Sequence, residues 1–139
     1  MAANRDGIVT PERSALMRSV RQKNTAPEMI VRRALHALGL RFRLHLANLP
    51  GTPDIVLARH STVIFVHGCF WHRHNGCART TSPKTRAAFW NFKFEANMKR
   101  DKMKSRTLRQ LGWRVITVWE CETRNLEKLK TRLARLFGI

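Results

Sequence analysis

The chain has 139 residues, of which 27 are Lys or Arg and 9 are Asp or Glu, so its formal net charge is +18 at pH 7. This surplus of positive charge indicates an anionic polymer as partner, because contacts between basic side chains and phosphates release condensed counterions. The alternative is a basic surface that serves only solubility. No segment pairs a continuous apolar face with clustered Lys, which argues against a membrane surface as partner.

The first predicted elements are basic. We expect residues 1–10 to be a disordered basic tail and residues 11–139 to form a single domain, since the length is that of one domain with its own core. The segment from Thr10 to Gln22 carries apolar residues at helical spacing and predicts a short helix. No signal peptide and no run of eighteen apolar residues precede the domain, so we expect a protein inside the cell.

A second helix is predicted by its start and stop signals. Thr25 and Glu28 match a capping box, with Thr25 as the N-cap, and the helix ends at Gly39. Its apolar side is predicted to consist of Met29, Ile30, Leu35 and Leu38.

Strands and two further helices follow. The predicted strands cover residues 41–46, 54–58, 63–66 and 113–119. The second and third form an antiparallel pair through a turn at His60 and Ser61. Helices are predicted over residues 84–111, where Phe89, Phe92, Ala96, Met103 and Leu111 recur at helical spacing, and 125–137. This order predicts an α/β fold (α+β), a mixed sheet with helices on its faces.

The stretch that follows the third strand has the composition of a metal site. Cys69, His72, His74 and Cys77 lie in one loop, and Cys121 lies just beyond the last strand. Three thiolates and one imidazole make a closed structural zinc site. Cys121 reaches that ion only if the strands ending at 66 and 119 lie side by side. The residues alone leave either histidine as the fourth ligand, and each cysteine alone would be a buried apolar side chain.

An acidic residue is expected near the end of the same sheet. Asp54 begins its strand after Pro53, close to the point where Val66 and His67 leave the neighbouring strand. Restriction-type nucleases hold a divalent ion in this way, with a carboxylate and the backbone carbonyl of a residue placed like Val66. His67 takes the place of the usual second-strand polar residues, as a general base or a stabiliser of the transition state. A turn-capping role is the alternative for Asp54.

Several other side chains are candidates for contacts with DNA. The long helix carries one face with residues spaced by four, namely Phe89, Lys93, Asn97 and Asp101. Lys93 and Asn97 are expected to read phosphates or base edges if that face points at a groove, with Asp101 orienting a histidine. A solvated face is the alternative.

Three apolar side chains are candidates for wedges. Phe70 and Trp71 are flanked by the metal ligands, and a pinned loop would hold them rigidly enough to enter a base stack. Met17 on the first helix could enter from the other groove. Core packing is the alternative for all three.

Six motifs stand in a fixed order along the chain. They are Arg13-Ser-Ala-Leu-Met-Arg-Ser-Val, Lys23-Asn-Thr-Ala-Pro-Glu28, Pro50-Gly-Thr-Pro-Asp54, His67-Gly-Cys-Phe-Trp-His72, Phe89-Trp90…Lys93…Asn97…Arg100-Asp101 and Trp113-Arg-Val…Val-Trp-Glu-Cys121. In these motifs the chain closely resembles the very-short-patch-repair (Vsr) mismatch endonucleases, and the resemblance covers roughly residues 13–122.

The resemblance implies a restriction-endonuclease-like fold and a magnesium-dependent nick on the 5′ side of the thymine in T:G mismatches, which arise when 5-methylcytosine deaminates. It implies a catalytic set of Asp54, His67, His72, Glu28 and Asp101, with magnesium on Asp54 and the Val66 carbonyl. The implied zinc ligands are Cys69, His74, Cys77 and Cys121. Phe70 and Trp71 would intercalate from the major groove and Met17 from the minor groove.

The chain departs from the family pattern at one point. Family members usually place one residue between the zinc histidine and the next cysteine, whereas Asn75 and Gly76 both intervene here. Glycine at the second position is suited to a bulged turn, so we expect the site to be retained.

The resemblance also sets expectations for partners. Double-stranded DNA with a T:G mismatch is the expected partner, with mismatch-repair proteins as further partners, and the protein is expected to be a monomer in the bacterial cytoplasm near the nucleoid. Two alternatives stay open, a zinc-stabilised DNA-binding module without catalysis and a restriction-like nuclease that cuts matched duplex.

Overall fold

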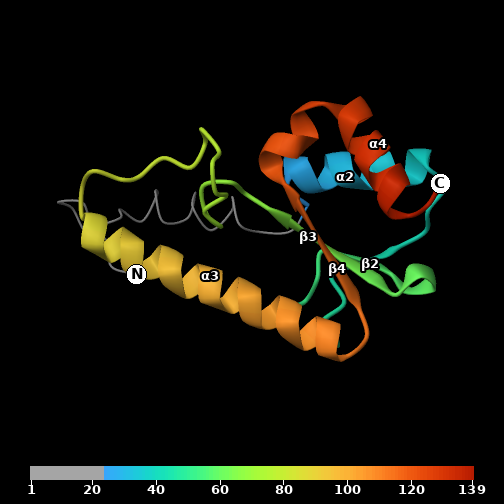
Figure 1. Ribbon diagram of the computed structural model, residues 1–139, viewed down its shortest axis with the longest axis horizontal. Coiled ribbons are helices and arrows are strands. Elements are labelled where there is room, and N and C mark those ends of the chain that lie inside the picture. The colour runs from blue at the N-terminus through green and yellow to red at the C-terminus, as the bar shows by residue number, and fades with distance from the viewer. Residues whose placement is uncertain (1–23) are drawn as a thin grey trace.

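The computed structural model describes residues 24–139 (Figure 1). The predicted tail, the first predicted helix and Met17 lie outside these residues. The elements are, in chain order, α2 (Ala26–Ala37), β1 (Arg43–Leu44), β2 (Ile55–Leu57), β3 (Thr62–His67), α3 (Ala87–Gln110), β4 (Arg114–Trp119) and α4 (Leu126–Leu136). Short 3-10 turns follow β2 and β4, over Ala58–His60 and Glu120–Arg124. The predicted order of helices and strands is confirmed for the described part of the chain.

The strands form one mixed sheet in the order β1-β2-β3-β4. β1 and β2 are antiparallel, and β2 and β3 form the antiparallel pair that the sequence predicted. β3 and β4 are parallel over six residue pairs, from Thr62 opposite Arg114 to His67 opposite Trp119. The two strands therefore end together, as a metal site shared by their two ends requires.

The helices cover both faces of this sheet. α2 and α4 lie on one face, and α3 lies on the other and extends beyond the sheet (Figure 1). Alternate residues of each strand point to opposite sides, so the core has two layers. Residues buried between the sheet, α2 and α4 include Leu35, Ile55, Ile64, Val118 and Leu133. The α3 side buries Val56, Val63, Phe65 and Leu108.

The buried face of the long helix differs from the one that its apolar pattern predicted. Phe92, Met103 and Leu111 are 73%, 63% and 60% exposed, whereas Phe94 and Leu108 are buried. Apolar residues occupy only the two ends of the inward face, because the middle of that face lines a polar cleft. A hydrophobic pattern therefore cannot identify this face.

Two smaller predictions also differ from the structure. Met29 of α2 is 38% exposed, and Val31 and Ala34 are buried instead. The first strand is only two residues long, rather than spanning 41–46, because His45 adopts a left-handed backbone with φ of 47° that ends the ladder.

No helix among residues 24–139 is long and apolar enough to cross a membrane.

The packing of α3 on the sheet gives a test of this architecture. Leu108→Ala should lower the free energy of unfolding by about 2 to 5 kcal/mol, because Leu108 is fully buried against the sheet. Leu111→Ala, three residues further along the chain and 60% exposed, should change it by less than about 0.5 kcal/mol. Urea unfolding of both variants measures the difference, and equal losses would contradict the described orientation of α3.

Candidate active site and metal centre

The loop after β3 separates two histidines that are close in sequence. Its turns are closed by backbone hydrogen bonds from His72 to Gly68 (3.1 Å) and from His74 to Cys69 (2.9 Å). Arg73, between the two histidines, has a left-handed backbone with φ of 55°. As a result His72 faces α3, while His74 faces the end of β4.

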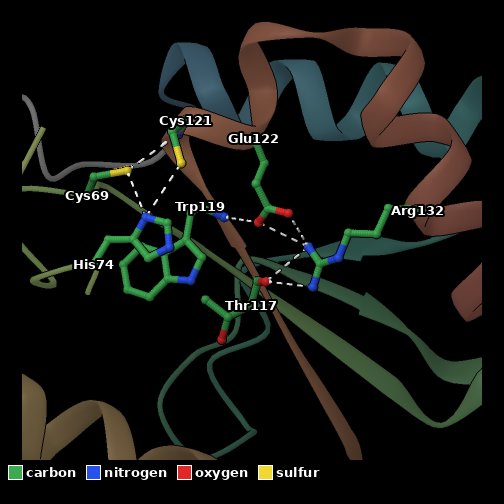
Figure 2. A network of polar contacts seen from close by, with 7 residues as sticks. All are labelled: Cys69, His74, Thr117, Trp119, Cys121, Glu122 and Arg132. Carbon is green, nitrogen blue, oxygen red and sulfur yellow. Dashed lines mark hydrogen bonds and ion pairs between the residues drawn. The ribbon is translucent and has the colours of Figure 1, made fainter. Parts of the chain in front are cut away.

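His74 joins the three cysteines at the ends of the two parallel strands. Ligand atoms of Cys69, His74, Cys77 and Cys121 all lie within 4.8 Å of one another. His74 Nδ1 is 3.6 Å from Cys69 Sγ and 3.5 Å from Cys121 Sγ (Figure 2). In a tetrahedral zinc site, with bonds of about 2.3 Å to sulfur and 2.0 Å to nitrogen, these atoms lie about 3.5 Å apart. The donor set and its spacing thus suit zinc.

A cation at this point would stabilise the ionised form of the Cys69 thiol. Burial raises the pKa of the Cys69 thiol to about 12, so a thiolate there needs a compensating positive charge. None of the three cysteines forms a disulfide.

The chain around the cluster is anchored to both β4 and α4 (Figure 2). The Trp119 ring stacks on His74 with centroids 4.2 Å apart, and its backbone N–H donates to Glu122 (2.9 Å). Glu122 in turn pairs with Arg132 at 2.9 Å, and Arg132 donates to the Thr117 carbonyl. The side of the cluster formed by Cys121 is therefore held by the C-terminal helix.

The extra residue before Cys77 is accommodated as expected. Gly76 has φ of 75°, a conformation that glycine adopts without strain, and Cys77 N–H donates to the His74 carbonyl at 3.4 Å. The bulged turn keeps His74 and Cys77 in one cluster.

His72 belongs to a different group, on the α3 side of the sheet. Its ring is stacked on His67 with centroids 3.9 Å apart, and its Nδ1 is 2.7 Å from Asp101 Oδ2. Burial, and then the nearby charge of His72, lower the pKa of His67 to about 4, so His67 is neutral at pH 7. Burial raises the pKa of Asp101, but its hydrogen bond and charge interaction with His72 outweigh this effect and the pKa lies below its usual value. An ionised Asp101 therefore fixes the orientation of the His72 ring.

Asp54 lies at the same end of the sheet. Its Oδ2 accepts a hydrogen bond from the Val66 backbone N–H at 2.7 Å, so the two residues meet as the sequence predicted. Burial raises the pKa of Asp54 to about 6, the Val66 N–H lowers it, and the neighbouring charge of Glu28 raises it. A buried carboxylate beside a second one is an oxygen donor whose ionised form a divalent cation would stabilise.

Glu28 lies in the capping box that the sequence predicted and also close to Asp54. Thr25 Oγ1 accepts from the Glu28 backbone N–H at 3.3 Å, while Glu28 Oε1 accepts from the backbone N–H of Asn24 at 3.2 Å. Its other oxygen contacts Arg32 and lies 2.7 Å from His45 Nε2. Glu28 thus caps α2 and, through His45, belongs to the group of ligand-type side chains that contains Asp54.

Sequence reasoning missed His45. It stood in a predicted alternating strand, where a histidine carries no signal of its own, and only its left-handed backbone turns it toward Glu28.

The predicted DNA-contacting residues are arranged around α3. Phe70 packs edge-on against Phe94 (5.3 Å) and Trp71 (5.0 Å), and both loop aromatics stay partly exposed. Asn97 Nδ2 donates to the Trp71 carbonyl at 2.9 Å. Lys93 is exposed at the start of this face, with its ammonium 5.6 Å from the Phe89 ring.

Most of the predicted catalytic and DNA-contacting residues line one cleft of about 830 Å³. Its lining includes Glu28, Asp54, His67, His72, Asn97 and Asp101. The aromatic loop residues stand on its wall, and Arg79, Arg100 and Lys104 add positive charge. Lys93 and the cysteine cluster lie outside the lining. The cleft thus combines basic side chains that suit an anionic substrate with carboxylates and a pair of imidazoles.

Comparison with known proteins shows the family of the chain. Residues 6–79 match the family model described as DNA mismatch endonuclease Vsr. The chain belongs to the Vsr family of DNA mismatch endonucleases. It is 51% identical to the type II nicking enzyme V.XorIIP of Xanthomonas oryzae pv. oryzae, over 92% of this chain and 94% of that protein. It is 45% identical to the DNA mismatch endonuclease Vsr of Escherichia coli, over 84% and 74%.

Membership in the Vsr family confirms the resemblance that the motifs indicated and identifies the chain as a DNA endonuclease. A third relative, the type II nicking enzyme V.NmeAIP of Neisseria meningitidis, is 40% identical over 94% of this chain and 93% of its own.

The burial of Asp54 predicts a pH-dependent cost to stability. The folded-state pKa of about 6 lies above the ordinary value of 3.8, so folding favours the protonated form, and stability falls as pH rises from about 4 through 6. In magnesium-free buffer, Asp54→Asn should therefore be more stable than the parent at pH 8, by about 2 to 3 kcal/mol, and about equal to it near pH 4. Chemical unfolding at the two pH values measures this.

Asp101→Asn serves as the control of opposite sign. Its pKa is lowered in the fold, so the ionised form is favoured and the substitution should destabilise the protein at pH 8. A pH-independent effect of Asp54→Asn would contradict the buried environment of that carboxyl.

Proposed function

We propose that the protein is a strand-specific, magnesium-dependent endonuclease that nicks 5′ of the thymine in T:G mismatches left by deamination of 5-methylcytosine. The observation that supports this most is the single cleft lined both by Asp54 and by the stacked pair His67–His72. We assign the four-stranded mixed sheet with Asp54 at its end to the restriction-endonuclease-like fold.

In this proposal the carboxylates hold the cation. Asp54 and the Val66 carbonyl bind magnesium, and Glu28 adds negative charge nearby. When bound, the ion supplies positive charge to the phosphate that is attacked. Although burial raises the pKa of Asp54 to about 6, this value lies below 7, so the carboxylate is mostly ionised at neutral pH.

The two histidines have different roles in the proposed reaction. His67, with its pKa lowered to about 4, is neutral and can accept a proton from the attacking water. Water then adds to phosphorus while the bond to the leaving oxygen breaks, and the leaving oxygen takes up a proton from solvent. His72, oriented by Asp101 at 2.7 Å, stabilises the charge that develops on the phosphate. Asp101 acts through His72 and is a positioning residue.

The remaining predicted residues hold and recognise DNA. Zinc on Cys69, His74, Cys77 and Cys121 is structural, because four protein ligands leave no position for substrate. It fixes the loop from which Phe70 and Trp71 enter the base stack. Lys93 and Asn97 contact the DNA beside them. Asn97 also holds the Trp71 carbonyl, so it couples this loop to α3. Met17 is assigned to the minor groove from the sequence motif alone.

The partner in this proposal is mismatched duplex DNA, bound by a single domain over residues 11–139 acting as a monomer. Mismatch-repair proteins are further partners. The three relatives named above are bacterial, which supports a place beside the nucleoid in the cytoplasm.

The direct test uses a 5′-labelled duplex with one T:G pair, set in several flanking sequences. The protein should nick only the thymine strand, only with magnesium, and not a matched T:A duplex of the same sequence. Asp54→Ala should abolish nicking and retain most of the binding. His67→Ala should slow nicking about 10²- to 10⁴-fold. His60→Ala, an exposed histidine in the turn after β2, should nick normally.

Two outcomes would contradict the proposal. Equal cutting of the matched duplex would indicate a restriction-like nuclease. Binding without a nick in every flanking sequence, with magnesium present, would indicate a DNA-binding module without catalysis.

A further inference from the structure

A second groove lies on the other side of the histidine pair. It has a volume of about 960 Å³ and runs between α3 and the end of β4. His67, His72 and Asp101 line both this groove and the cleft that contains Asp54. The three side chains therefore form a wall between the cleft and the groove. A DNA strand that passes them would run from the cleft into the groove.

The α3 wall of this groove carries unpaired positive charge. Lys102, Arg106 and Arg109 are spaced by four and three residues, so they share one face of the helix. All three are exposed, and none forms an ion pair with a residue in the described part of the chain. The carboxylate that lines the groove is Asp101, which is engaged by His72.

The side of the groove opposite α3 is formed by the loop after β3 and by β4. Arg73 also lines the groove, but it donates to the carbonyls of Phe70 and Thr81 and lies 4.0 Å from the Phe94 ring, so its guanidinium is a structural part of the loop. Thr117 and Trp119 of β4 complete this side. The cations available to a ligand are those of α3.

We propose that this groove holds the phosphate backbone of the DNA on one side of the nicked bond. Lys102, Arg106 and Arg109 span about 10 Å of helix, which equals the axial length of about three phosphates of one strand. The bound DNA strand thus runs along α3, past His67 and His72, and into the cleft. This inference rests on the proposed function, since it assumes that the cleft is where DNA is cut.

The test compares two triple variants of the whole protein. The groove variant carries Lys102→Gln, Arg106→Gln and Arg109→Gln. The control carries Arg33→Gln, Lys128→Gln and Arg135→Gln, three exposed residues of α2 and α4 on the other face of the sheet. Both variants have three positive charges fewer than the parent. Binding to a fluorescent T:G duplex is measured in magnesium-free buffer at several salt concentrations, after thermal unfolding has confirmed that both variants fold.

The groove variant should bind more weakly, and the slope of log K against log salt should become shallower by about 2 to 3, one for each phosphate that the variant no longer neutralises. The control variant should keep the slope of the parent. Equal changes in the two variants, or none in the groove variant, would overturn the inference.

Truncated duplexes locate the bound phosphates. Removing about one helical turn of DNA from one flank of the mismatch should make the parent and the groove variant bind alike, and removing the other flank should preserve their difference. A difference that survives both truncations would overturn the inference. So would a groove variant that binds DNA normally but no longer binds polyglutamate, since the groove would then fit an acidic protein segment.

The two proposals fail separately. If the parent protein does not nick T:G duplex, the proposed function fails. If it nicks while the groove variant binds as the parent does, only the groove assignment fails.

Discussion

The parallel pairing of β3 with β4 is the constraint on which both sites depend. It places His67 opposite Trp119, so the loop that follows β3 begins beside the residues that follow β4. Cys121 reaches the loop cysteines for this reason, and its backbone N–H lies 3.4 Å from Cys69 Sγ. The same pairing leaves His67 on the α3 side of the sheet. One register thus sets both the metal cluster and the position of the imidazole pair.

Much of this arrangement could be predicted from the sequence. Element order, the antiparallel β2–β3 pair and the meeting of Asp54 with Val66 follow from local patterns and turn chemistry. The residues did not decide between His72 and His74 for the cysteine cluster, because both stand in one short loop. The left-handed backbone of Arg73, which turns them apart, leaves no trace in hydrophobic patterning.

The cleft explains where sequence reasoning was wrong. The part of α3 that lines the cleft is polar, with Asn97 and Asp101 between the buried Phe94 and Leu108. The spacing of apolar residues therefore predicted a face of α3 that is exposed. Burial of Asp54 and His67 opposes their charged forms. For His67 this favours the neutral imidazole that the proposed mechanism uses. For Asp54 it disfavours the ionised carboxylate and costs stability, which a bound cation would offset.

One loop places His74 in the cysteine cluster and His72 against His67 and Asp101, and the proposed zinc site and chemistry depend on this division. Zinc content and zinc-edge X-ray absorption of the parent, His74→Ala and His72→Ala proteins test it most directly. We expect about one zinc per chain with three sulfur ligands and one nitrogen in the parent and in His72→Ala, and an absent or altered site in His74→Ala. Absence of zinc from His72→Ala, with an unchanged site in His74→Ala, would contradict it.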